Sequence, residues 1–370
     1  MSGAPIPLVD LKAQHAEIAD EVAAGFAQVI ADTAFILGPA VRGFEEAFAR
    51  FCGVPHCVGV ANGTDAIELM VRALGIGPGD EVIVPANTFI ASALGVVRAG
   101  AAPVIVDCDE YQLLDPGRIE DAVTPRTRAV LPVHLFGQTA DMEAVGEIAR
   151  RRGLLVLEDA AQSQGARRHG RPSGGLGTAA ATSFYPGKNI GAYGDAGAVT
   201  TASDEVAERV RKLRNWGSEK KYHHPEIGFN SRLDTLQAVV LSAKLKRLEA
   251  WNDARRRAAA RYDELLAGTD GVELPRTLPG NEHVWHLYVI RVPRRDEALA
   301  RLNAEGIGAG IHYPVPLHLH GALRHLGYSE GDFPVAEKAA AEILSLPMHP
   351  HITAEEQERV AAALRRALAS

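Results

Sequence analysis

Between residues 57 and 159 the sequence alternates helical stretches with short apolar runs, and this alternation constrains the fold more than any other feature. The apolar runs at residues 82–84, 104–106 and 154–159 each end in polar residues. Such a rhythm is typical of parallel strands joined by helices. Because helices cover both faces of a parallel sheet, its strands are nearly continuous runs of Val, Leu and Ile. We therefore predict an α/β fold whose large domain has a mainly parallel sheet flanked by helices.

The second half of the sequence predicts a smaller domain. A chain of 370 residues is longer than one hydrophobic core usually organises. From about residue 236 a long helical stretch runs to Gly268, and we place the domain change near its middle. Residues 1–250 then form an N-terminal arm and the large domain, with the arm helix starting near residue 8. Residues 251–370 form a smaller α+β domain, with a strand at 283–292 and helices at 296–307 and at the C-terminus.

Composition and charge exclude several classes of protein. The net charge of −7 is modest, and Lys and Arg are scattered rather than gathered in one stripe, so we expect no nucleic-acid partner. No apolar run reaches the roughly 20 residues of a membrane helix, and the first residues do not resemble a signal peptide. We therefore expect no membrane partner and a cytoplasmic location.

The cysteines predict neither disulfides nor a metal site. Three cysteines, an odd number without a CxxC pair, are more typical of free thiols than of a disulfide framework. Cys52, His56 and Cys57 have side chains that can ligate a metal, but no second cluster completes a tetrahedral set. We predict no metal.

Two residues point to a specific chemistry. A predicted strand ends at Asp159, and Lys188 follows 188 − 159 = 29 residues later in a glycine-rich loop. Singly, Asp159 is an ordinary helix cap and Lys188 an ordinary solvated lysine. The surrounding glycines favour close approach of a ligand; they are Gly187, Gly191, Gly194 and Gly197. A buried carboxylate that keeps a pyridine nitrogen protonated and a lysine that forms a Schiff base are the groups that pyridoxal phosphate needs.

A phosphate site is predicted at the start of a helix. Asn62, Gly63, Thr64 and Asp65 directly precede a helical pattern, so backbone N–H groups and the Thr64 hydroxyl are available to a phosphate. The alternative is a simple N-cap turn, and the Lys of a nucleotide P-loop is missing. Ser183 offers a second hydroxyl to the same phosphate.

Aromatic residues and histidines supply candidate walls of the site. Phe89 follows a strand and can stack on a flat heterocycle, although a core position is an equal alternative. His312 and Tyr313 lie in a proline-interrupted loop that forms either a substrate wall or a surface turn. The histidines of this loop do not have metal-ligand spacing.

In their order along the chain, six segments make the sequence similar to the sugar aminotransferases of the DegT/DnrJ/StrS family, a branch of the fold-type I pyridoxal-phosphate enzymes. These segments are NGTDAI, PANTFIAS, EDAAQSQGA, SFYPGKNIGAYGDAGAV, GFNSRLDTLQAVVL and GIHYPVPLHL. The resemblance runs from end to end. It implies a fold-type I transferase with pyridoxal 5'-phosphate as its cofactor.

The resemblance assigns roles to individual residues. It implies that Lys188 is the Schiff-base lysine, that Asp159 binds the pyridinium nitrogen and that Gln162 lies beside the cofactor hydroxyl. Phe89 stacks on the ring. Gly63, Thr64 and Ser183 hold the phosphate, joined by Asn230 from the second subunit of a homodimer with shared active sites.

The resemblance also implies a reaction. L-glutamate donates its amino group, a nucleotide-linked keto sugar receives it, and the released Lys188 shuttles protons. Relatives with histidine in place of this lysine catalyse dehydration, so Lys188 favours amino transfer. The segments around Lys188 and residue 221 favour amination at C3 of a dTDP-3-keto-6-deoxyhexose. In that subgroup the residues that border the sugar or its diphosphate are Tyr185, Lys221, His312 and Tyr313.

Three alternatives stay open. The first is an aminotransferase acting at C4, or on a UDP-linked or cyclitol ketone, with the same cofactor residues. The second is a non-catalytic cofactor-binding regulator, because a fold does not fix a function. The third is a nicotinamide-dependent dehydrogenase, which needs GxGxxG after its first strand; the GIGPGD at residues 75–80 does not meet that context.

Overall fold

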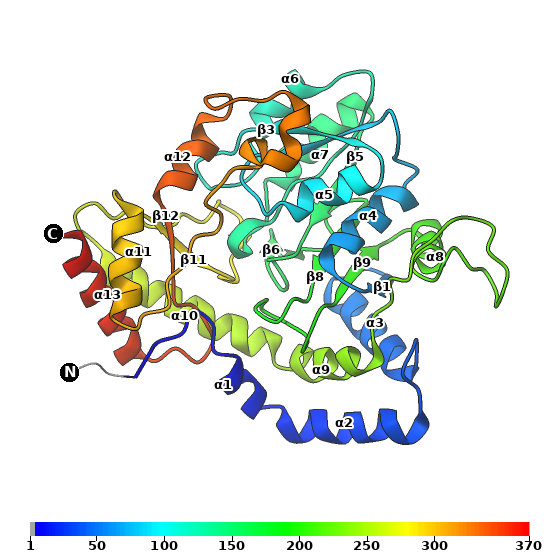
Figure 1. Cartoon of the computed structure of the whole chain (residues 1–370), viewed down its shortest axis with the longest axis horizontal. Helices are drawn as coiled ribbons and strands as arrows, with labels where there is room; N and C mark the ends of the chain where they lie inside the picture. Colours follow the sequence, from blue (N-terminus) through cyan, green and yellow to red (C-terminus); the bar gives the residue numbers. More distant parts are fainter. Residues whose placement is uncertain (1–3, 370) are drawn as a thin grey trace.

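The computed structural model describes residues 4–369 and is built around a seven-stranded sheet, whose arrangement among the helices is seen in Figure 1. In chain order its strands are β1 (His56–Val60), β2 (Glu81–Pro85), β3 (Ala102–Val106), β4 (Thr127–Val130), β5 (Leu155–Asp159), β8 (Ala179–Ser183) and β9 (Gly197–Thr201). Their spatial order is β1-β9-β8-β5-β4-β2-β3. All pairs are parallel except the two made by β9, which runs antiparallel to β1 and to β8. The predicted mainly parallel α/β sheet is confirmed.

Both faces of the sheet are buried, as the continuous apolar strands predict. In β2, Val82 and Val84 pack into one hydrophobic cluster and Ile83 packs into another, because successive side chains point to opposite faces. The helices α4 (Gly63–Ala73), α5 (Ala91–Arg98) and α8 (Asp204–Leu213) cover the first face. The short α6 (Ile119–Ala122) and α7 (Met142–Arg152) cover the second.

The N-terminal arm contains two helices where the apolar spacing predicts one. They are α1 (Leu11–Ala16) and α2 (Ala19–Asp32), followed by α3 (Pro39–Phe51). Val22 of α2 packs against Val240 of α9 (Thr235–Leu245), so the arm lies along α9 (Figure 1).

The long helix predicted from residue 236 is also two helices, α9 and α10 (Leu248–Leu266), which break at residues 246–247. Leu248 packs with α9 in the core below the sheet, whereas Tyr262 and Leu266 lie in a separate C-terminal core. The helix therefore passes from one core into the other. The domain boundary at residue 250 stays a prediction.

The C-terminal core is built on the antiparallel pair β11 (Tyr288–Arg291) and β12 (Ile343–Leu346). Its helices are α10, α11 (Arg295–Ala304) and α13 (Ala354–Leu368), whereas Ala336 of α12 (Pro334–Glu342) packs into the cluster on the first face of the large sheet. A separate three-stranded ribbon contains β6 (Arg167–Arg168), β7 (Arg171–Pro172) and β10 (Asn281–Glu282). The predicted strand at 283–292 is shorter because Trp285 has a φ of 48° and the N–H groups of Val284 and Leu287 donate to the carbonyls of Gly137 and Phe136 instead.

The start of the chain joins this C-terminal core. Ile6 is 1% exposed and packs among its residues. The Ile6 N–H donates to the Gly306 carbonyl at 2.9 Å, and the Gly308 N–H donates to the Ile6 carbonyl at 2.7 Å. Residues of α13 belong to the same cluster, so Ile6 and this last helix lie on the same side of the molecule (Figure 1). No helix within residues 4–369 has the length and apolarity needed to cross a membrane.

Candidate active site

A cavity of about 380 Å³ opens at the carboxyl ends of β2, β5 and β8. Ligands in open α/β sheets bind at this edge. The predicted site residues that line it are Gly63, Thr64, Phe89, Asp159, Gln162, Ser183, Tyr185, Lys188 and Tyr313.

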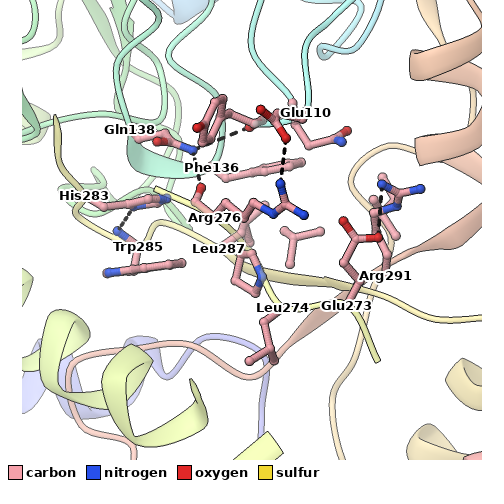
Figure 2. A pocket seen from close by; sticks show the side chains of 15 residues that line it. Glu110, Phe136, Gln138, Glu273, Leu274, Arg276, His283, Trp285, Leu287 and Arg291 are labelled. Atoms are coloured by element: carbon pink, nitrogen blue, oxygen red, sulfur yellow. Dashed lines mark hydrogen bonds and ion pairs between the residues drawn. The ribbon is translucent and has the colours of Figure 1, made fainter. Parts of the chain in front are cut away.

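A second hollow, of about 40 Å³, is unsuited to a large ligand (Figure 2). Its charged side chains are already paired: Arg276 Nη1 lies 2.6 Å from Glu110 Oε2, and Arg291 pairs with Glu273. It contains none of the predicted site residues. The cavity at the sheet edge is therefore the candidate active site.

Asp159 lies at the last position of β5 and its carboxylate is held in place. The residue is 4% exposed. Its Oδ2 accepts a hydrogen bond from Ser92 Oγ at 2.7 Å, and its Oδ1 accepts from the Ala161 N–H at 3.1 Å. Thr88 Oγ1 in turn lies 2.8 Å from Ser92 Oγ. These hydrogen bonds fix the orientation of the carboxylate, which suits Asp159 to face a cationic ring nitrogen.

Lys188 follows β8 in the glycine-rich loop. Burial lowers the pKa of Lys188 to about 8, and the negative charge of Asp159 opposes this shift. Loss of hydration disfavours the ammonium form of a lysine. A substantial share of the amine is therefore neutral near physiological pH, and the neutral amine is the form that attacks a carbonyl.

The start of α4 forms a cradle next to β8 and β9. Asn62 caps the helix by accepting a hydrogen bond from the Asp65 N–H at 2.8 Å. A Cβ atom on Gly63 would lie 2.6 Å from Ser183 Cβ, and one on Gly197 would lie 2.4 Å from the Asn62 carbonyl oxygen. These contacts require glycine at both positions. They bring the free N–H groups of the first helical turn beside the Ser183 hydroxyl, an arrangement suited to an anion.

Gln162 and Tyr313 form a polar wall. Gln162 Oε1 accepts a hydrogen bond from the Phe136 N–H at 2.7 Å, and its Nε2 donates to Tyr313 Oη at 3.0 Å. The Tyr313 ring lies 5.2 Å from the Phe89 ring between centroids. Phe89 is 52% exposed, so it is not a core residue. Burial raises the pKa of Tyr313, which keeps its phenol protonated.

His312 lies beside this wall as a neutral side chain. Its Nδ1 hydrogen-bonds Ser345 Oγ at 2.8 Å. Burial and the charge of Lys188 lower the pKa of His312 to about 4. At neutral pH its imidazole therefore carries no charge next to the lysine.

Residues 16–365 match the DegT/DnrJ/EryC1/StrS aminotransferase family. The chain belongs to this family. It is 50% identical to the dTDP-3-amino-3,4,6-trideoxy-alpha-D-glucose transaminase of Streptomyces venezuelae over 97% of this chain and 95% of that protein. It is 48% identical to a pleiotropic regulatory protein of Geobacillus stearothermophilus, over 96% of each. Among solved structures, S. venezuelae DesV in complex with a ketimine intermediate superposes with a TM-score of 0.96, at 50% identity and over 98% of both chains.

Three predicted residues of this aminotransferase do not line the cavity of their own chain: His312, Lys221 and Asn230. Lys221 lines an open groove with Trp216 and Tyr222, and its Nζ lies 5.2 Å from the centre of the Tyr222 ring. Asn230 Oδ1 accepts a hydrogen bond from Arg232 Nη2 at 2.7 Å. The roles predicted for the site residues, including the action of Asn230 across a subunit interface, stay predictions.

The structure adds residues to the site of the aminotransferase that the sequence did not reveal. Ser92 lies in the quoted PANTFIAS segment, but only the order of strands in the sheet brings it to Asp159. Asp195 lines the cavity beyond the glycine-rich loop. His286 belongs to the run 283–292, where a strand prediction gave no reason to expect a buried imidazole within electrostatic range of Lys188.

Proposed function

We propose that this aminotransferase depends on pyridoxal 5'-phosphate and transfers an amino group from L-glutamate to C3 of a dTDP-3-keto-6-deoxyhexose. The observation that carries the proposal is the meeting of the Lys188 amine and the buried Asp159 carboxylate in one cavity, beside the N-terminus of α4. The 50% identical S. venezuelae transaminase, named for a dTDP-3-amino sugar, supports the choice of sugar and position.

The residues of the cavity fit the cofactor. Asp159 would hold the ring nitrogen, Phe89 would contact the ring face, and Gln162 would lie near the ring hydroxyl. The phosphate would bind where Gly63 permits close contact between α4 and Ser183, with Thr64 as a further donor. When bound, the cofactor supplies an electron sink that stabilises negative charge at the carbon next to the amino group.

The side chains of the chain itself supply orientation and proton transfer. Lys188 Nζ has a pKa of about 8, so it accepts and releases protons near the working pH. The hydrogen bond between Gln162 and Tyr313 fixes both side chains on one side of the cavity. His312, neutral and bonded to Ser345, gives the substrate a polar surface without adding charge.

The proposal includes a homodimer with shared active sites. Apolar side chains are unusually exposed on the surface: Phe35 is 46% exposed, Ile36 50%, Tyr222 81% and Ile227 92%. Large exposed apolar side chains in groups indicate contact surfaces. In a dimer, Asn230 and Lys221 would reach the cavity of the second subunit, where Lys221 and Tyr185 would border the sugar or its diphosphate.

A second candidate function is a cofactor-binding regulator without turnover. The name of the 48% identical Geobacillus protein favours it. In this case the cofactor would bind to Lys188, but glutamate and a keto sugar would not complete a catalytic cycle.

The test follows the absorbance of the bound cofactor. Glutamate is expected to convert the lysine-bound form into the amino form, and dTDP-3-keto-6-deoxyglucose to reverse this, with a C3 amino sugar as product. Lys188→Ala is expected to abolish both changes, whereas Lys246→Ala, which removes a 66% exposed lysine on α9's C-terminal cap, is not.

Each other outcome has a defined meaning. If glutamate converts the cofactor but only a 4-keto or UDP-linked sugar reverses the change, that sugar class is the substrate. Binding of the cofactor without conversion would favour the regulator. A wild-type protein that never binds the cofactor would refute the proposal.

A further inference from the structure

The residue after Lys188 is held by a buried hydrogen-bond network. Asn189 is 1% exposed. Its Nδ2 donates to Asn252 Oδ1 at 2.8 Å and to the Val284 carbonyl at 3.1 Å, and its Oδ1 lies 3.1 Å from His286 Nδ1. Asn252 Nδ2 donates to the Gln164 carbonyl at 2.9 Å. All polar atoms of the Asn189 side chain are therefore used.

This network fixes the position of the proton on His286. The carbonyls of Val284 and Gln164 can only accept, so the amide groups facing them must donate. Asn189 Oδ1 is then an acceptor, and His286 Nδ1 must carry the hydrogen. The second ring nitrogen, Nε2, is the unprotonated one in a neutral imidazole.

His286 is in turn anchored to the C-terminal core. Arg255 on α10 is completely buried, and its Nη1 donates to the carbonyls of Trp285 at 3.1 Å, His286 at 3.4 Å and Met348 at 2.9 Å. The core residues Ala258 and Ala259 follow on the same helix. A continuous set of contacts thus runs from the C-terminal core to the residue next to Lys188.

Burial keeps His286 neutral, and nearby positive charges add to its effect. Loss of hydration, followed by the charges of Lys188 and Arg255, places the pKa of His286 well below its ordinary value. Protonation would place a buried cation beside these two cationic groups. The hydrogen on Nδ1 is therefore retained as a fixed donor across the working pH range.

We propose that His286 is a positioning residue for Lys188: its Nδ1–H holds Asn189, and through Asn189 it sets the orientation of the Lys188 loop. This inference rests on the proposed function. Without the Nδ1 donor, Asn189 Oδ1 becomes a buried acceptor without a partner, and the loop can relax away from the C-terminal core. His286 is not among the residues that line the cavity, so the contacts proposed for the sugar do not depend on it.

Three substitutions separate the two ring nitrogens. His286→Asn places an amide donor near the position of Nδ1, His286→Gln places one near Nε2, and His286→Phe fills the volume without a donor. His325→Asn is the matched control, because His325 is exposed and away from the cavity. Thermal unfolding of each variant identifies any that fail to fold.

The main measurement is the pH titration of the absorbance of the bound cofactor, together with kcat and KM. For His286→Phe we expect the apparent pKa of the cofactor band to move by about half a unit or more. We also expect kcat to fall by about tenfold or more, with KM for the keto sugar unchanged. His286→Asn should return both values most of the way to those of the wild type, and His286→Gln should not.

Several results would overturn the inference while leaving the function intact. One such result is a folded His286→Phe variant whose cofactor titration and kcat equal those of the wild type. Another is that His286→Gln, rather than His286→Asn, restores both values. A further check is Asn189→Ala, whose effect on kcat should not add to that of His286→Phe, because both remove the same contact. Failure of the wild-type protein to bind the cofactor would instead refute the proposed function.

Discussion

At the scale of single residues, the site combines an amine whose pKa is lowered by burial with a carboxylate held in place by hydrogen bonds. Lys188 loses hydration, while Asp159 accepts from Ser92 and from the Ala161 N–H. Their juxtaposition could be predicted from the strand end at Asp159 and the glycines around Lys188. The partners Ser92 and His286 could not, because only the folded sheet brings residues so distant in sequence into contact.

The pKa of Lys188 predicts how the stability of the cofactor-free protein depends on pH. The folded-state pKa of about 8 lies below the ordinary value of 10.5, so the unfolded chain binds more protons between these values. The free energy of unfolding should therefore rise with pH across this window and be lowest below pH 8. Relative to Lys188→Met, we expect the wild type to gain about 2 kcal/mol between pH 7.5 and 9.5. Denaturant titrations of both proteins measure this, and parallel pH profiles would contradict it.

Asp159→Asn should affect both the cofactor and Lys188. Loss of a charged hydrogen-bond partner for the ring nitrogen is expected to lower kcat/KM by about 10–100-fold. Because the charge of Asp159 opposes the effect of burial, its removal should lower the pKa of Lys188 further. The pH dependence of cofactor association with the cofactor-free protein reports this pKa. An upward shift would contradict the assigned electrostatics.

At the scale of elements, the cavity depends on how closely α4 approaches β8 and β9. Gly63 and Gly197 remove the side chains that would separate the helix from these strands. The helix start at Asn62 could be predicted from its capping residue and the apolar pattern. The contact with Ser183 depends on the placement of β9 between β1 and β8, which no local pattern indicates.

Gly63→Ala tests this close approach. The added Cβ would meet Ser183 Cβ at 2.6 Å, so the helix start must shift. We expect a loss of stability of about 1–3 kcal/mol and weaker binding of the cofactor. Gly146→Ala is the matched control, since a Cβ in that position in α7 meets nothing within 4 Å. Cofactor titration and thermal unfolding measure both effects, and equal behaviour of the two variants would show that the contact is unimportant.

Element boundaries show a limit of sequence patterns. Both long helical predictions, at residues 8–30 and from 236, are interrupted in the structure, at residues 17–18 and 246–247. Apolar residues recur at helical spacing on both sides of each break, so the pattern does not reveal it. The path of the chain around the core sets these breaks, with α2 following α9 and α10 leaving for the C-terminal core.

At the scale of the whole molecule, we propose that the site is complete only in a dimer. Within its own chain, Asn230 lies outside the cavity and is bonded to Arg232. Its amide would then bind the cofactor phosphate in the cavity of the second subunit. A contact between two chains produces no periodic pattern in the sequence of either chain. Only the family resemblance therefore predicts that Asn230 acts across the interface.

Mixing two inactive variants tests this arrangement. If Asn230 acts across the interface, a dimer of one Lys188→Ala chain and one Asn230→Ala chain has one intact site. Random reassociation of equal amounts makes half of the dimers mixed, so about one quarter of all sites should be wild type and another quarter should carry both substitutions. Activity should return in the mixed dimers alone. Activity and mass of the mixture are measured together. Lack of recovery in verified mixed dimers would place Asn230 in the site of its own chain.

Ile6 pairs with Ile307, so two residues that are synthesised far apart in time lie side by side in the folded chain. Ile6 must remain unpaired until residues 306–308 have been synthesised, because its backbone hydrogen bonds are made with Gly306 and Gly308. Contacts this distant in sequence form late and slowly. The sheet with its Asp159 and Lys188 can thus assemble before Ile6 meets residues 306–308, and this late contact joins the N-terminal arm to the C-terminal core.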